Sequence, residues 1–187
     1  MNAAQIIILS LALALNSFIS YAVAGVFLKK EKQSLMVMYS AIMLASLILL
    51  IGTGLWLGLR IGSMSGQNNY YISFGILLIM GLKVIFDSIR SKPEDKIYDL
   101  SETRNIVLIS IADGITPLII SIAAGLTLEK IYPSWIIICG WQILALVSGL
   151  YLGSKYGNQA YRFRTGPIGG LILLAAALKL LIDFIGY

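Results

Sequence analysis

Residues 10–30 read SLALALNSFISYAVAGVFLKK, and residues 110–130 read SIADGITPLIISIAAGLTLEK. Seven residues recur one hundred positions later without a gap: Ser10, Ala12, Ile19, Ala24, Gly25, Leu28 and Lys30. Two further stretches match in the same order, GLWLGLRIG (54–62) with GLYLGSKYG (149–157) and LKVIFD (82–87) with LKLLID (178–183). The chain is therefore predicted to be an internal duplication.

The composition is that of a membrane protein. Hydrophobic residues make up 58% of the chain and charged residues only 12%, about half the charge of an ordinary soluble domain. The run Ala4–Leu28 holds no charged residue and exceeds the roughly 18 apolar residues that indicate a membrane span. A cleaved signal peptide would need a basic start and a shorter apolar core. We therefore expect an integral membrane protein.

Charge and cysteine content exclude several function classes. The net charge is +5, but the basic residues fall at span ends, where they set orientation, so no nucleic acid is expected as a partner. One cysteine and no histidine exclude an intramolecular disulfide and a histidine metal site. Nucleotide-binding and hydrolytic motifs are absent from the sequence. Neither an enzyme nor a bound cofactor is expected.

Six spans are predicted, at residues 5–28, 36–59, 71–90, 105–128, 133–154 and 167–186, each long enough to cross a bilayer. Residues 1–90 form the first three-helix repeat, 91–104 a cytoplasmic linker, and 105–187 the second repeat. Because each half has an odd number of spans, the halves enter the membrane from opposite faces. The predicted fold is an all-α integral membrane protein with six transmembrane helices in two inverted three-helix repeats, a plan common among secondary transporters.

Basic residues outside the spans predict the orientation. Loops one, three and five hold ten of them, and loops two and four hold two, Arg60 and Lys130. The ten are Lys29, Lys30, Lys32, Arg90, Lys92, Lys96, Arg104, Lys155, Arg162 and Arg164. Cytoplasmic loops carry the excess of Lys and Arg, so the odd-numbered loops are predicted inside and both termini outside.

The fourth span contains three residues that suit a buried helix poorly: Asp113, Gly114 and Pro117. Pro117 has no N–H, so the carbonyl of Asp113 loses its helical partner, and Gly114 weakens the same turn. An ionisable residue at this depth is a functional candidate by default. Asp113 is predicted either to line a cargo or ion path or to be a structural carboxyl tied to a neighbouring helix.

The equivalent turn of the first span supplies neutral oxygens. Asn16 and Ser17 match Thr116 and Pro117, and Ser20 follows one turn later. Oxygen donors on two related helices could coordinate a hard cation, with Asp113 and Asn16 as the metal ligands. The alternative is that these side chains hold helices together by hydrogen bonds. Gln142 of the fifth span is interpreted in that second way.

Two lysine–aspartate pairs lie one turn apart, Lys83 with Asp87 and Lys179 with Asp183. Each pair can neutralise its own charge. They either extend toward the interface or form a charge-compensated gate on the ion path. The glycines at positions 54, 58, 149 and 153 have GxxxG spacing, which permits close helix approach and makes a homodimer an expectation.

The whole chain resembles the small bacterial manganese exporters of the MntP type, within the LysE transporter superfamily. The resemblance is carried by LALALNSF (11–18), YISFGILLIMGLKVIFDSIR (71–90), GLYLGSKYG (149–157) and GPIGGLILL (166–174). It implies a multi-pass protein of a bacterial or archaeal cytoplasmic (inner) membrane. The chain is a divergent member, because Asn16 stands where the family has an aspartate and Ala45 stands near its span-two glutamate.

Three readings of function follow. The first is a secondary transporter exporting a cation such as Mn²⁺ through a midplane site between the repeats, driven by an exchanged proton or the membrane potential. The second keeps the fold with a neutral or amino-acid-like solute, which the missing acids favour. The third is a non-transporting membrane partner protein.

Overall fold

The computed structural model describes residues 3–28, 33–65, 68–90, 103–128, 131–156 and 165–185. These ranges form six helices, each long and apolar enough to cross a membrane. The helices are α1 (Ala3–Leu28), α2 (Gln33–Ser65), α3 (Asn69–Arg90), α4 (Thr103–Thr127), α5 (Ile131–Tyr156) and α6 (Thr165–Ile185). The expected all-helical, six-span architecture is confirmed for the described residues.

The predicted span ends agree with the helices to within a few residues, except at the end of α2. That helix continues to Ser65, six residues beyond the predicted end. The side-chain amide of Asn69 donates a hydrogen bond to the carbonyl oxygen of Gly62 at 2.7 Å, which satisfies one of the carbonyls exposed near a helix C-terminus. Residues 91–102 of the predicted linker lie outside the described residues, and positions 103 and 104 already belong to α4.

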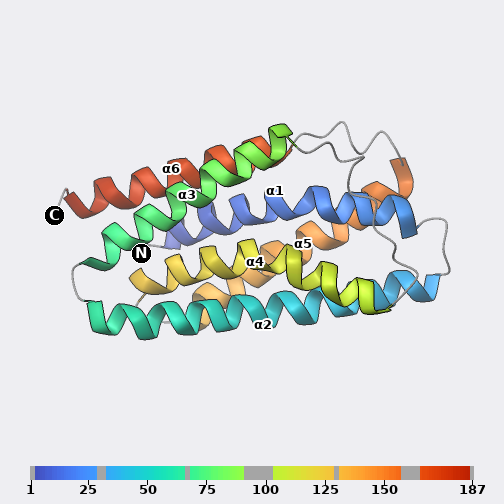
Figure 1. Cartoon of the computed structure of the whole chain (residues 1–187), viewed down its shortest axis with the longest axis horizontal. Helices are drawn as coiled ribbons and strands as arrows, with labels where there is room; N and C mark the ends of the chain where they lie inside the picture. The colour runs from blue at the N-terminus through green and yellow to red at the C-terminus, as the bar shows by residue number, and fades with distance from the viewer. Residues whose placement is uncertain are drawn as a thin grey trace.

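The helices of the two halves alternate in the bundle (Figure 1). The most extensive contacts join α1 to α5, α2 to α4 and α3 to α6, followed by α1 to α6 and α3 to α4. Each of these pairs takes one helix from each half of the chain. Figure 1 also shows that α4, α5 and α6 run opposite to α1, α2 and α3 respectively. The inverted repeat stays a prediction, and this arrangement is the one it requires.

Glycines make the two largest contacts close. A Cβ added to Gly25 of α1 would lie 2.5 Å from the carbonyl oxygen of Leu150 of α5. A Cβ added to Gly125 of α4 would lie 2.5 Å from the carbonyl oxygen of Leu55 of α2. Backbones meet at both places, so no larger residue fits without a shift. The GxxxG glycines contact the partner helices in the same way: Gly54 and Gly58 lie against α4, and Gly149 and Gly153 against α1.

This internal use of the glycines removes the argument for a homodimer that was based on them. The faces predicted to meet a second copy are already covered by helices of the same chain. The homodimer itself stays a prediction, now without that support.

Pro117 does not break α4. The helix is continuous from Thr103 to Thr127 with Pro117 inside it. A proline removes one backbone hydrogen bond but keeps a helical φ, and the turns on either side continue. What remains is a local weakness at the turn that carries Asp113.

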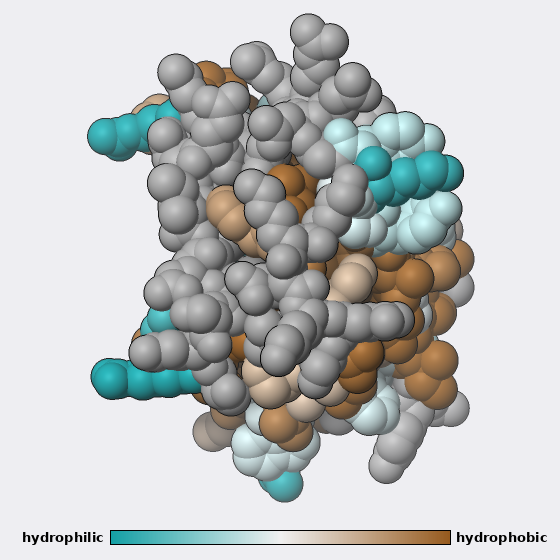
Figure 2. Space-filling view, turned by 90° about the vertical axis from the view of Figure 1, so that its right-hand side faces the viewer, coloured by the Kyte–Doolittle hydropathy of each residue, from teal (hydrophilic) through white to brown (hydrophobic). Residues whose placement is uncertain are grey.

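Basic side chains lie at one end of the bundle. Figure 2 looks onto the end where α3 and α5 finish and α4 begins, and hydrophilic side chains project from its rim. The exposed basic residues near these helix ends are Arg90, Arg104 and Lys155. Most of the other residues used to predict the orientation lie outside the described ranges, and the orientation stays a prediction.

Candidate functional site

The side chain of Asp113 meets α1 near the middle of the bundle. The hydroxyl of Ser20 donates a hydrogen bond of 3.5 Å to Oδ1 of Asp113. Ser20 is 6% exposed, and Asp113 is half-buried. Asp113 lies nine residues from the Arg104 end of its span, about 14 Å at the helical rise. That is close to the centre of a hydrocarbon core about 30 Å thick.

Two more polar side chains of α1 belong to this cluster. Tyr21 is fully buried, lies within electrostatic range of Asp113 and shares a hydrogen bond with Ser17. Ser17 is 7% exposed. The structure therefore groups one carboxylate with three hydroxyls, which we call the Asp113 cluster: Ser17, Ser20, Tyr21 and Asp113. Tyr21 was not predicted as a site residue, because an aromatic residue in an apolar span ordinarily indicates packing.

The positions of Asn16 and Thr116, the other predicted ligands, relative to Asp113 follow from the opposite directions of α1 and α4. Because α1 and α4 run in opposite directions (Figure 1), moving from Ser20 back to Asn16 corresponds to moving from Asp113 on to Pro117. Both steps are four residues, which keeps the same helix face. Asn16 and Thr116 are half-buried. They lie one turn from the Ser20–Asp113 hydrogen bond, and no hydrogen bond between them is recorded among the described residues.

Gly114 and Asn16 also lie where neighbouring helices come close. A Cβ on Gly114 would collide with the side chain of Leu50 of α2. A Cβ on Gly169 of α6 would lie 3.2 Å from the backbone nitrogen of Asn16. Gly114 therefore permits close packing of α4 on α2, in addition to weakening the turn. The candidate site is enclosed by α2 and α6 as well as by α1 and α4.

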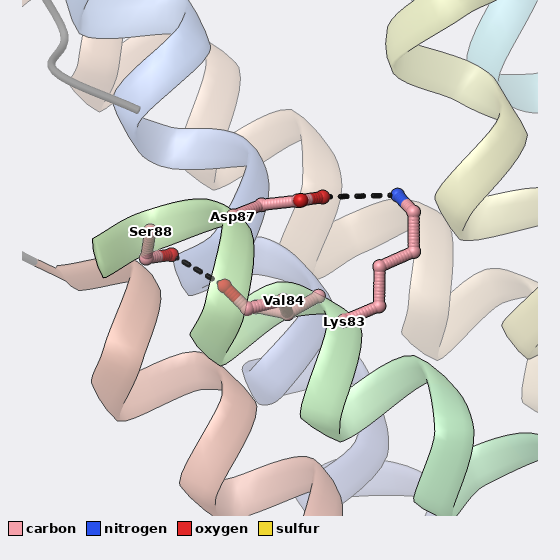
Figure 3. Close-up of polar contacts among 4 residues, drawn as sticks. All are labelled: Lys83, Val84, Asp87 and Ser88. Carbon is pink, nitrogen blue, oxygen red and sulfur yellow. Dashed lines mark hydrogen bonds and ion pairs between the residues drawn. The ribbon is translucent and has the colours of Figure 1, made fainter. Parts of the chain in front are cut away.

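The two lysine–aspartate pairs behave differently. Lys83 and Asp87 form an ion pair of 3.2 Å with both side chains more than half exposed on α3 (Figure 3). Asp183 instead accepts a hydrogen bond of 2.6 Å from the side-chain amide of Gln5. Lys179 is exposed and forms no ion pair with Asp183 in the part of the chain that the structure describes. Neither pair lies in the Asp113 cluster, so the gate reading gains no support.

Gln142 of α5 is a buried polar residue with an unexpected environment. It is 1% exposed, and neither amide atom has a hydrogen-bond partner among the described residues. The expected interhelical hydrogen bond is therefore not found. A buried polar group without a hydrogen-bond partner costs folding free energy. The Gln142 amide is therefore a second polar group inside the bundle, apart from the Asp113 cluster.

The chemistry available to the site is narrow. Within the described ranges, no three His, Cys, Asp or Glu side chains come together as a metal cluster. One carboxylate with hydroxyl and amide oxygens is a hard-ligand set of low charge, suited to weak, reversible binding of a hard cation.

Comparison with known families identifies the chain. The family model described as "Mntp: Putative manganese efflux pump" matches residues 50–181, more than two-thirds of the sequence. The chain belongs to the Mntp family. The match begins within α2, so it leaves out α1, the helix in which Asn16 replaces the expected aspartate.

Two Mntp relatives cover nearly the whole chain, and a third covers 70% of it. "Putative manganese efflux pump MntP 1" of Wolinella succinogenes is 26% identical over 96% of this chain and 97% of its own length. The protein of Methanosphaera stadtmanae, "Putative manganese efflux pump MntP", is 27% identical over 96% of this chain and 99% of its own. A protein of that same description from Methanothermobacter thermautotrophicus is 28% identical over 70% of this chain and 68% of its own length. No solved structure matches the chain. As a member of the Mntp family, the protein is a membrane transporter and not an enzyme.

Proposed function

We propose that this protein exports a divalent cation, with Mn²⁺ as the cargo, across the cytoplasmic membrane. The cation would bind at the Asp113 cluster, where Asp113 supplies the charge. The hydroxyls of Ser17 and Ser20 and the nearby Asn16 and Thr116 would supply neutral oxygens. The observation that carries the proposal is the burial of a carboxylate against hydroxyls of α1 at mid-depth.

Asp113 would also exchange a proton. Facing the cytoplasm, the carboxylic acid would release its proton and accept the cation; facing outward, it would release the cation and take up a proton. One carboxylate cannot hold both at once, so binding of one excludes the other. Such competition couples two fluxes through a single group.

We infer that the two faces open by movement of the inverted repeats against each other. Support comes from the opposite directions of corresponding helices and from the matching Gly25–Leu150 and Gly125–Leu55 contacts. Because α1 and α4 come from different halves, relative movement of the halves would alter the surroundings of Asp113.

The other two readings have less support. The family description and the names of the relatives concern manganese efflux and do not favour a neutral solute. A purely structural membrane partner, by contrast, predicts that loss of the Asp113 charge leaves cation flux unchanged.

The test is Mn²⁺ flux in liposomes containing the purified protein, followed with an internal metal reporter. We expect saturable flux in the wild type and a fall of more than about a hundredfold in Asp113→Asn, because loss of a buried charge partner typically costs about 3–5 kcal/mol. The matched control is Asp87→Asn, which removes a carboxylate that is exposed on α3; its flux should match the wild type.

Absence of Mn²⁺ flux in folded wild-type protein would overturn the manganese proposal. Equal flux in the wild type and Asp113→Asn would keep transport but reject Asp113 as the charged ligand. Varying Mg²⁺, Ca²⁺ and the proton gradient then determines the cation preference and the coupling.

A further inference from the structure

A pocket of about 280 Å³ opens where α2 and α4 end and α3 begins. This is the end of the bundle opposite to the one seen in Figure 2. Its walls include Gly62, Ser63, Asn69, Tyr70 and Thr127. Thr127 lies fourteen residues beyond Asp113 on α4, about 21 Å along the helix. The pocket is therefore separate from the Asp113 cluster.

Three polar side chains of the pocket each donate a hydrogen to a backbone carbonyl. Asn69 donates its amide to Gly62 at 2.7 Å, Ser63 donates to Arg60 at 2.7 Å, and the Thr127 hydroxyl donates to Ala124 at 3.2 Å. A carbonyl can only accept, so the contact with Gly62 fixes which amide atom of Asn69 is the nitrogen. One side-chain hydrogen of each of these three residues is thus bound to a backbone carbonyl, and Asn69 keeps a second amide hydrogen.

The side-chain oxygen of Asn69 is a hydrogen-bond acceptor that faces no donor in the described part of the chain. Its Oδ1 is buried and has no hydrogen-bond partner among the described residues. A buried carbonyl oxygen without a donor is costly and is the kind of ligand that hard cations accept. A buried acceptor oxygen without a donor favours a cation over an anion at this point of the wall.

Helix ends add a field of the same sign. The last turns of α2 and α4 line the pocket at Ser63 and Thr127, and a helix C-terminus carries about half a negative charge. The N-terminus of α3 at Asn69 carries a positive partial charge that offsets the negative partial charge of one of these C-termini. The negative partial charge of the other C-terminus remains. Arg60 does not line the pocket, and its guanidinium lies 5.5 Å over the ring of Trp56.

We propose that this pocket is a second, weaker cation site at the outer mouth of the protein, through which the transported cation leaves. This inference deepens the proposed function and rests on it for the direction of transport. At about 30 Å³ per water, 280 Å³ accommodates a divalent cation with six waters. Binding through waters and neutral oxygens keeps affinity low, which suits release. The buried Ser121 hydroxyl, without a hydrogen-bond partner in the described ranges, lies on α4 between Asp113 and the pocket.

The experiment measures Mn²⁺ binding to the purified full-length protein from the loss of the free-ion electron paramagnetic resonance signal. It is done in the wild type and in an Asp113→Asn background, where the central site is removed. Ser63→Asp should tighten the remaining binding by about tenfold, because a unit charge is added within a few ångströms of the ion. Ser63→Lys should abolish it.

The matched controls are Met64→Asp and Met64→Lys. Met64 adjoins Ser63 but is 88% exposed and does not line the pocket, so the same charge changes should alter binding by less than about twofold. If the Mn²⁺ affinity is the same in the Ser63 variants as in the parent protein, or changes equally in the Met64 variants, the pocket is not a cation site.

Flux separates this inference from the proposed function. If liposome flux is present but binding does not respond to Ser63, the outer site fails and the transport proposal stands. If binding responds to Ser63 while the wild type shows no flux, the outer site stands and the transport proposal fails. With both present, Ser63→Asp should slow turnover, because the cation leaves the mouth more slowly.

Discussion

At the scale of the residue, two polar side chains inside the bundle have different environments. The half-buried Asp113 accepts a hydrogen bond from the hydroxyl of Ser20 and lies near Tyr21. Gln142 is buried with both amide atoms lacking hydrogen-bond partners among the described residues. The residue one repeat earlier, Leu47, is apolar and buried. The amide of Gln142 is therefore a cost to stability that an apolar side chain of similar size would avoid.

Gln142→Leu should stabilise the protein by about 1–3 kcal/mol, because it removes an unsatisfied buried amide. The measurement is the midpoint of thermal unfolding in detergent. The control is Gln5→Leu, which removes an amide that donates to Asp183 and should destabilise. A loss of stability in Gln142→Leu would show that its amide has a partner in the membrane-embedded protein, such as an ordered water.

At the scale of the helix, close approach depends on glycine at particular positions. Gly25 and Gly125 each meet a backbone carbonyl of the partner helix, whereas a Cβ on Gly75 or Gly140 would meet nothing within 4 Å. All four are helical glycines, so they share the same intrinsic propensity cost. They differ only in what surrounds them.

Gly25→Ala and Gly125→Ala should each destabilise by about 1–3 kcal/mol through overpacking, and by similar amounts. Gly75→Ala and Gly140→Ala should be neutral or stabilising by up to about 1 kcal/mol, because alanine favours the helix. Unfolding of the four variants in detergent gives the comparison. If all four behave alike, propensity decides their effect and the contacts with α5 and α2 do not.

The helices were predictable from sequence, and most of the site was not. Long apolar runs leave few alternatives for the spans, and the internal repeat indicates which helices correspond. The end of α2 was missed because the cap on Gly62 comes from Asn69 of the next helix. Asp113 stood out as a lone acid, but its neighbour Tyr21 did not, since hydropathy alone cannot say which face of α1 meets α4.

At the scale of the whole molecule, the ends of the bundle carry matching aromatic–cation contacts. Arg60 lies 5.5 Å over Trp56 near the end of α2, and Lys155 lies 5.5 Å over Tyr151 near the end of α5. These residues occupy equivalent places in the two halves. Aromatic rings with adjacent cations are typical of the membrane interface, so the contacts indicate the two surfaces of the bilayer.

Single cysteines in a Cys139→Ser background should report the orientation. Met64→Cys, near the end of α2, should react with a membrane-impermeant maleimide on intact cells, since that end is predicted outside. Tyr156→Cys, exposed at the opposite end, should react only after permeabilisation. The reverse pattern would invert the topology and would turn the outer mouth into an entry site.

The alternation of the two halves also constrains how the protein is made. When the ribosome has delivered α1, α2 and α3, the glycine face of α1 still lacks α5, which begins more than a hundred residues after α1 ends. Until then, the glycine-containing faces of α1 and α2 are exposed to lipid. The first half therefore cannot reach its native packing before the second half is made. A nascent chain that stops after Arg90 lacks the contacts between the halves and should be degraded by quality-control proteases.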